Sequence, residues 1–158
     1  MKSRVHVNIN VRDLTASVAF YGALFDADPT KVREDYANFR LDTPGLHLAL
    51  VRKPDHPPVQ TEQHHGVELF DRDALDAWRA RLETRGVNVR IEEQVTCCYA
   101  VADKFWVADP DGNEWEFWFR TEEAEAMHED AAEGECCAPM PMATLEGLKP
   151  KQAPGGCC

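Results

Sequence analysis

Residues 5–11 read VHVNINV, and this short stretch indicates how the first part of the chain folds. Hydrophobic and polar residues alternate strictly along it, which is the pattern of a β-strand with one buried face. The polar residues His6, Asn8 and Asn10 share one side of the strand. If the aliphatic side packs on a helix, these three side chains are expected to face a cavity.

The residues that follow predict a helix and two further strands. Asp13 offers an N-cap, and apolar residues then recur at helical spacing up to Pro29, which predicts an amphipathic helix. Strands are expected over 36–41 and 46–51, with turn residues between them. A proline-rich connector at 54–58 closes this unit.

The second half of the chain repeats the same order of elements. A strand is expected over 64–70, a helix over 73–85, and extended segments over 87–95, 99–107 and 114–119. The chain therefore reads as a doubled strand-helix-strand-strand-strand module.

Individual residues support an internal duplication. His6 aligns with His64, and the turn glycine Gly45 aligns with Gly112. Modules over about 4–53 and 62–120 are each too small to bury a good core alone, so their sheets are expected to pair, with the helices on the outer faces. We predict an α+β fold of two paired βαβββ modules that line one metal-binding cavity.

The composition changes after about residue 120. The folded domain is expected over 1–120, and 121–158 is an acidic tail with little apolar periodicity. A short helix is expected over 122–132, followed by a flexible segment. The tail carries two of the three cysteine pairs, Cys136-Cys137 and Cys157-Cys158, which could collect soft metal or be dispensable.

Charge and hydropathy exclude several classes of partner. The formal net charge is -11, and no cluster of Lys and Arg offsets it, so nucleic acid and anionic membrane are poor partners. No apolar run reaches the length needed to cross a bilayer, and the first residues do not form a signal peptide. We therefore expect a soluble cytoplasmic protein of one domain.

Four positions are expected to face the cavity at equivalent places in the two modules. They hold His6, Ala49, His64 and Glu116. Two imidazoles and one carboxylate form the facial triad that leaves adjacent positions open on Fe(II). The alternative is that these are unrelated polar residues in a groove, but their duplicated positions favour the metal site.

Three other polar residues are not assigned to the metal. His65 is expected on the helix side of its strand. His47 aligns with Glu114 rather than with Glu116, and it is not counted as a ligand. Lys104 is expected to be solvated.

The remaining cysteine pair, Cys97-Cys98, lies within the predicted domain. Neighbouring Cα atoms are ~3.8 Å apart, shorter than the usual disulfide separation, so a dithiol is the expected state. Two adjacent thiolates suit a soft centre such as As(III). In a regular strand they would point to opposite faces, so a loop or bulge is predicted over 95–99, unless both cysteines simply pack as small hydrophobic residues.

These residues resemble a known family. His6, the HHGVE segment at 64–68 and the DPDGNEWE segment at 109–116 resemble the vicinal oxygen chelate superfamily, which includes glyoxalases, bleomycin-resistance proteins and extradiol dioxygenases. The resemblance covers residues 4–120. More closely, Cys97-Cys98 and the cysteine-bearing tail resemble the ArsI carbon-arsenic lyases, which are related to the cadmium-induced CadI proteins.

The resemblance implies an Fe(II)-dependent, dioxygen-using carbon-arsenic lyase that detoxifies trivalent organoarsenicals, aryl or methyl, to arsenite. It assigns Fe(II) to His6, His64 and Glu116, and the arsenical to Cys97 and Cys98. Two alternatives remain: a non-catalytic protein that binds metalloid or cadmium, and a glyoxalase-like metal-dependent lyase. The chain is expected to be a monomer or a homodimer, and in a swapped dimer the partner could complete the cavity.

Overall fold

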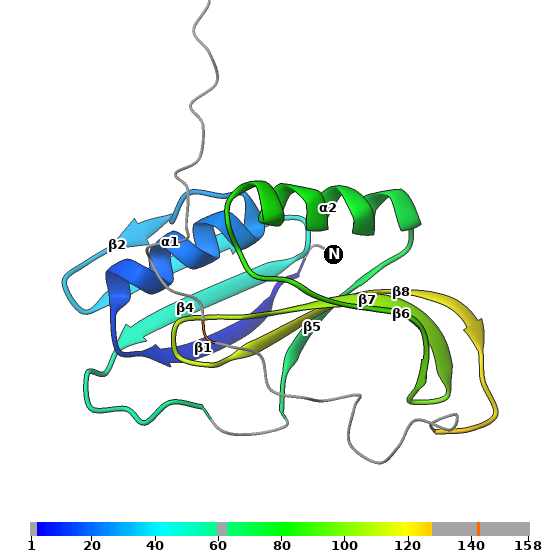
Figure 1. The fold of residues 1–158 in the computed structure, drawn as a ribbon. Helices are drawn as coiled ribbons and strands as arrows, with labels where there is room; N and C mark the ends of the chain where they lie inside the picture. Colours follow the sequence, from blue (N-terminus) through cyan, green and yellow to red (C-terminus); the bar gives the residue numbers. More distant parts are fainter. Residues whose placement is uncertain (1–2, 60–62, 128–141, 143–158) are drawn as a thin grey trace, which may run out of the picture.

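The computed structural model describes residues 3–59, 63–127 and 142, and it contains the two predicted βαβββ modules (Figure 1). The elements of the first module are β1 (Val5–Val11), α1 (Leu14–Phe25), β2 (Lys31–Val32), β3 (Tyr36–Leu41) and β4 (Leu46–Arg52). Those of the second are β5 (His65–Leu69), α2 (Arg72–Thr84), β6 (Arg90–Cys97), β7 (Ala100–Ala108) and β8 (Glu114–Glu123).

Each module forms its own four-stranded sheet. The strand orders are β1-β4-β3-β2 and β5-β8-β7-β6. In both sheets the first strand pairs in parallel with the last, and the other pairs are antiparallel. The two sheets therefore have the same topology, which confirms the predicted doubling and the α+β fold class.

Local sequence signals account for the ends of the helices. Asp13 caps α1 through a hydrogen bond that its side chain accepts from the backbone of Ala16, and Asp71 caps α2 in the same manner. Gly86 follows α2 with φ of 79°, a left-handed conformation that glycine adopts without steric cost. The strand β2 was not predicted, because it has only two residues and is held by pairing with β3.

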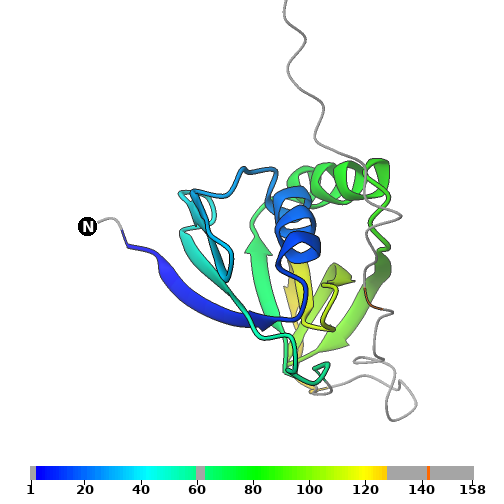
Figure 2. The ribbon, with the colours of Figure 1, turned by 90° about the vertical axis from the view of Figure 1, so that its left-hand side faces the viewer.

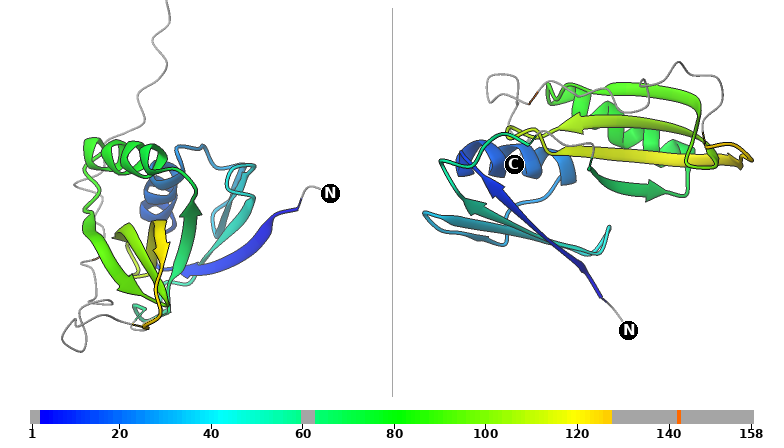
Figure 3. Two further views of the ribbon diagram at one scale, coloured as in Figure 1. Left: turned by 90° about the vertical axis from the view of Figure 1, so that its right-hand side faces the viewer. Right: turned by 90° about the horizontal axis from the view of Figure 1, so that it is seen from below.

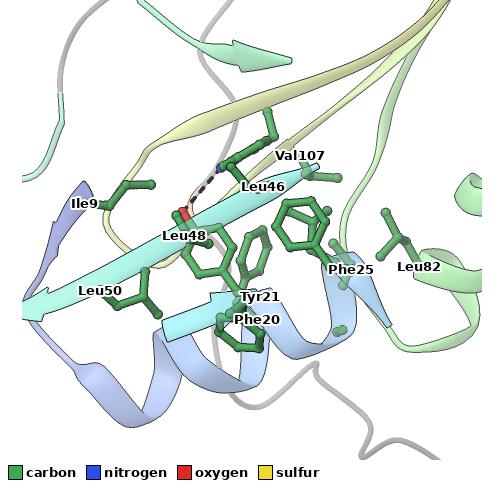
Figure 4. Packing of buried hydrophobic residues seen from close by; sticks show 14 of the residues in the cluster. Ile9, Phe20, Tyr21, Phe25, Leu46, Leu48, Leu50, Leu82 and Val107 are labelled. Atoms are coloured by element: carbon green, nitrogen blue, oxygen red, sulfur yellow. Dashed lines mark hydrogen bonds between the residues drawn. The ribbon is translucent and has the colours of Figure 1, made fainter. Parts of the chain in front are cut away.

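Helix α1 lies between the two sheets, and α2 lies over the second sheet (Figures 2 and 3). One continuous hydrophobic cluster joins α1 to both sheets. Figure 4 shows Phe20 and Tyr21 of α1 beside Leu48 of β4, in a cluster that also contains Val107 of β7. The helices were expected on the outer faces of paired sheets. Instead both helices lie against apolar faces, with α1 between the two sheets and α2 over the second sheet, and the polar face of each sheet is turned away from them.

Buried polar contacts join the two modules as well. The Tyr21 hydroxyl on α1 donates a hydrogen bond to Asp109 at 2.8 Å and accepts one from the indole of Trp115 at 3.3 Å. At the end of β1, the Arg12 side chain binds the buried carboxylate of Asp111 at 2.6 Å. Because Asp109 and Asp111 lie in the turn before β8, these contacts fix the first module against the second.

The C-terminal part of the domain differs from the prediction. Strand β8 continues to Glu123, because Glu122 and Glu123 pair with the beginning of β7. The expected helix over 122–132 is therefore wrong at its start, and its residues after 127 lie outside the described residues, as do both cysteine pairs of the tail. In the described part of the chain, no helix has the length and hydrophobicity required to cross a membrane.

Removing the Tyr21 hydroxyl is expected to weaken the contact between the modules. Tyr21→Phe leaves the buried Asp109 carboxylate without one of its donors, so the free energy of unfolding should fall by about 1–3 kcal/mol. Urea denaturation measures this change. Tyr99→Phe is the matched control, because Tyr99 is exposed; equal stability of the two variants would contradict a bridging role for Tyr21.

Candidate metal and thiol site

The polar face of the second sheet brings together two of the three predicted metal ligands. Nε2 of His64, just before β5, lies 3.6 Å from Oε2 of Glu116 on β8. The His64 ring also packs against the edge of Trp106, with ring centroids 4.8 Å apart. Gly66, which pairs with Glu116, has no side chain to cover the carboxylate. Both ligand groups therefore point to the same side of this sheet.

Lys104 on β7 lies on the same face of the sheet as Glu116 and contacts its carboxylate. Its ammonium lies 3.1 Å from Glu116 Oε1 and 3.4 Å from Glu92 Oε2, and the residue is only 4% exposed. The expectation of a solvated lysine is therefore wrong. Burial acts to lower the pKa of Lys104, but the negative charges of Glu116, Cys97 and Glu92 outweigh it and raise the pKa, so this side chain stays cationic.

The predicted irregularity at the cysteine pair is a tight turn between β6 and β7. Cys98 and Tyr99 both have positive φ, 56° and 65°, and they connect two antiparallel strands. This is the backbone of a two-residue hairpin turn. It brings the two sulfur atoms to 3.5 Å from each other, although regular strand geometry would separate them. The turn is also tied to the end of the domain, because Met127 accepts a hydrogen bond from the Cys98 amide.

A small pocket connects the thiols to the carboxylate of Glu116, the predicted metal ligand. It has a volume of about 90 Å³, and its lining includes Cys97, Cys98, Lys104 and Glu116. Ala100 and Ala102 contribute only methyl groups to its wall, which keeps it open. A group held by the two sulfur atoms would therefore lie next to Glu116.

The polar face of the first sheet carries the third predicted ligand. His6 on β1 pairs with His47 on β4, and Asn8 pairs with Ala49. In the second sheet the position of Asn8 is taken by Gly66, whose partner is Glu116. The register thus confirms the alignment of Ala49 with Glu116.

His47 and its neighbours were not assigned a role from the sequence. The rings of His6 and His47 stack with centroids 4.6 Å apart. Burial lowers the pKa of His47, and the charges of His6, Arg40 and Arg4 act in the same direction. No motif marks this pair, because it depends on the pairing of β1 with β4. The only signal in the sequence is a histidine at position 47, where the second module has Glu114.

His65 lies on the opposite face of the second sheet from His64. Its ring packs on Trp115, which belongs to the hydrophobic cluster under the helices. Burial lowers the pKa of His65, so the neutral ring is favoured. The prediction that His64 rather than His65 faces the site side is confirmed.

One chain does not bring all three ligands to one point. His6 belongs to the first sheet, while His64 and Glu116 lie on the second. Among residues 3–59, 63–127 and 142, no group of three or more His, Cys, Asp or Glu side chains is arranged to hold a metal ion. The chain alone therefore presents two half-sites, one on each sheet.

The architecture and these half-sites define a protein of the paired βαβββ class. The family described as "Glyoxalase/Bleomycin resistance protein/Dioxygenase superfamily" matches residues 3–117, and the chain belongs to it.

Curated relatives match over most of their length. The chain is 40% identical over 137 residues to the "Probable trivalent organoarsenical cleaving enzyme" of Bacillus subtilis (strain 168), covering 87% of this chain and 92% of that protein. It is 38% identical over 143 residues to the "Cadmium-induced protein CadI" of Mycobacterium tuberculosis (strain ATCC 25618 / H37Rv), covering 85% and 93%.

Solved structures agree on the fold. A glyoxalase/bleomycin resistance protein/dioxygenase from Alicyclobacillus acidocaldarius superimposes with a TM-score of 0.65 at 18% identity, covering 76% of this chain and 92% of that one. The fosfomycin resistance protein FosX from Listeria monocytogenes gives a TM-score of 0.59 at 18% identity, covering 75% and 93%.

Proposed function

We propose that this protein is an Fe(II)-dependent, dioxygen-using carbon-arsenic lyase that converts trivalent organoarsenicals to arsenite in the cytoplasm. The observation that carries the proposal is the pocket in which Cys97, Cys98 and Glu116 meet. The similarity to proteins named as organoarsenical cleaving enzymes supports the same substrate class.

The donor groups fit an Fe(II) ion held by His6, His64 and Glu116. Two ligand atoms at about 2.1 Å from one ion lie about 3.0–3.4 Å apart, so the 3.6 Å between His64 and Glu116 requires only a small adjustment. Two imidazoles and one carboxylate leave adjacent positions free on such an ion. The bound Fe(II) supplies the activation of dioxygen.

A second copy of the chain completes the ligand set in this proposal. The polar face of the first sheet, with His6, meets the polar face of the partner's second sheet, with the partner's His64 and the partner's Glu116. A two-fold dimer then forms two equal sites, because each chain supplies both kinds of face. This assembly accounts for the half-sites that α1 separates within one chain.

In this proposal the cysteines of the pocket bind arsenic, and Lys104 positions Glu116. Cys97 and Cys98 replace two oxygen ligands of the trivalent arsenic with sulfur and release two water molecules. The 3.5 Å between the sulfur atoms allows both to bind one arsenic atom. Lys104 holds the Glu116 carboxylate in place through their ion pair. The carbon-arsenic bond is thereby held beside the metal position.

A different function, sequestration of metalloid or cadmium without catalysis, is favoured by the similarity to proteins named for induction by cadmium. It predicts stoichiometric binding and no consumption of oxygen. A glyoxalase-like lyase is less consistent with the thiol pocket and with Ala49, because the resemblance leads one to expect a carboxylate at that position.

Turnover distinguishes catalysis from sequestration. The protein is loaded with Fe(II) without oxygen, and a trivalent arsenical and then oxygen are added. We expect many arsenite molecules per chain for the unchanged protein and none above background for Glu116→Ala, with arsenical binding retained. One arsenite or fewer per chain in the unchanged protein would contradict the lyase proposal.

The cysteine pair is expected to determine capture of the substrate. Cys97→Ser and Cys98→Ser each leave one sulfur ligand for arsenic, so affinity for the trivalent arsenical should fall at least about tenfold, because a hydroxyl is a poor ligand for a soft centre. Isothermal titration calorimetry with the anaerobic protein measures this. Thr96→Ser, next to the pair, is the control, and unchanged affinity in both cysteine variants would rule out capture by these thiols.

Mixing two inactive variants tests the shared site. His6→Ala and His64→Ala each remove one ligand from every site of a homodimer. Equal amounts of the two variants are unfolded together and refolded. Half of the resulting dimers then contain one chain of each variant, and one of the two sites in such a dimer has all its ligands. About a quarter of full turnover should therefore return. Recovery of none would indicate that each chain builds its site alone.

A further inference from the structure

A line of polar side chains crosses the open face of the first sheet and ends at His6. It runs from Tyr36 and Asn38 on β3 to His47 on β4 and then to His6 on β1. The Asn38 amide donates a hydrogen bond to the Tyr36 hydroxyl at 3.0 Å and lies 3.4 Å from Nε2 of His47. The rings of His47 and His6 are nearly parallel, with an interplanar angle of 13° and centroids 4.6 Å apart. The contacts are therefore continuous across three strands.

In the described part of the chain, the contact with His47 is the main one that restricts the ring of His6. A metal-binding histidine normally donates its second ring N–H to a carboxylate, a carbonyl or water, which fixes the ring. In the described part of the chain, the side chain of His6 has no such hydrogen bond, and its ring contact is with His47. The residue is exposed to solvent, so close packing does not restrict the rotation of its side chain.

We infer that His47 is a positioning residue: its ring, held by Asn38 and Tyr36, fixes the orientation in which His6 binds the metal. This inference rests on the proposed function, because His6 is a metal ligand only there. It adds a residue that the ligand set does not contain.

The second module supports this role by comparison. The equivalent ligand, His64, packs against the buried indole of Trp106. Each module thus places an aromatic ring against its metal-binding imidazole. In the first module that ring belongs to His47, on the neighbouring strand.

His47 is not a fourth ligand. The lone pair of an imidazole nitrogen lies in the plane of its ring. Because the two rings are stacked in nearly parallel planes, their lone pairs do not converge on one ion. The position equivalent to Glu116 is Ala49, which has no donor atom. The function of the His47 ring is therefore to limit rotation of His6.

Titration with Co(II) as the probe tests the inference. The full chain is freed of metal, and the dissociation constant and the visible absorption spectrum of the Co(II) complex are recorded. His47→Ala is expected to weaken Co(II) binding about 10-fold or more, the usual effect of removing a residue that orients a metal ligand. It is also expected to change the absorption spectrum. His47→Phe keeps a flat ring against His6 and should remain within about threefold of the unchanged protein. His56→Ala, in the connector after β4, is the control, and thermal unfolding checks that each variant is folded.

The outcomes separate the inference from the proposed function. If His6→Ala abolishes Co(II) binding but His47→Ala leaves both affinity and spectrum unchanged, the positioning role is wrong and the metal site stands. If His47→Phe is as weak as His47→Ala, stacking is not the cause and the inference also fails. If Co(II) binding does not depend on His6 or Glu116, the proposed metal site is wrong, and the inference with it.

Discussion

The packing of α1 against both sheets stabilises the whole domain. Burial of apolar surface is the main stabilising contribution to folding, and here a single helix supplies it to two modules that are each too small to build a core alone. The hydrogen bond from Tyr21 to Asp109 fixes the position of α1, because buried polar groups are stable only when they are hydrogen-bonded.

This packing also decides where chemistry is possible. The apolar faces are turned to the helices, so the predicted ligands lie on the polar faces of two different sheets. In the described part of the chain these predicted ligands do not come together. Domain stability and site assembly are therefore separate: the helix builds the domain, and contact between chains completes the proposed site.

Much of the fold and part of the site could be predicted from the sequence. Alternation of residue types identifies β1, and the duplicated pattern identifies the equivalent positions of His6, His64, Ala49 and Glu116. These predictions succeed because a strand has a period of two, so spacing along the chain fixes the face. The end of β8 was missed because its last residues follow their pairing with β7, which local sequence does not encode.

The turn at Cys98 and Tyr99 was likewise predicted only in part from the sequence. Adjacent cysteines imply that something must interrupt the strand, but the left-handed backbone at Cys98 and Tyr99 and the approach of Lys104 to Glu116 appear only in the folded chain. A lysine is usually exposed, and only the neighbouring carboxylates, brought from β6 and β8, stabilise its burial.

Both helices, most strands, the doubling, the strand faces and the candidate ligands can be predicted from the sequence, because they follow from periodicity and residue type. Three features follow from tertiary packing alone: α1 lies between the two sheets, His64 and Glu116 meet without His6, and His47 stacks on His6. The physical reason is that these contacts join residues distant in the chain, and the burial of shared apolar surface, rather than any local preference, selects among the ways in which two similar modules can pack.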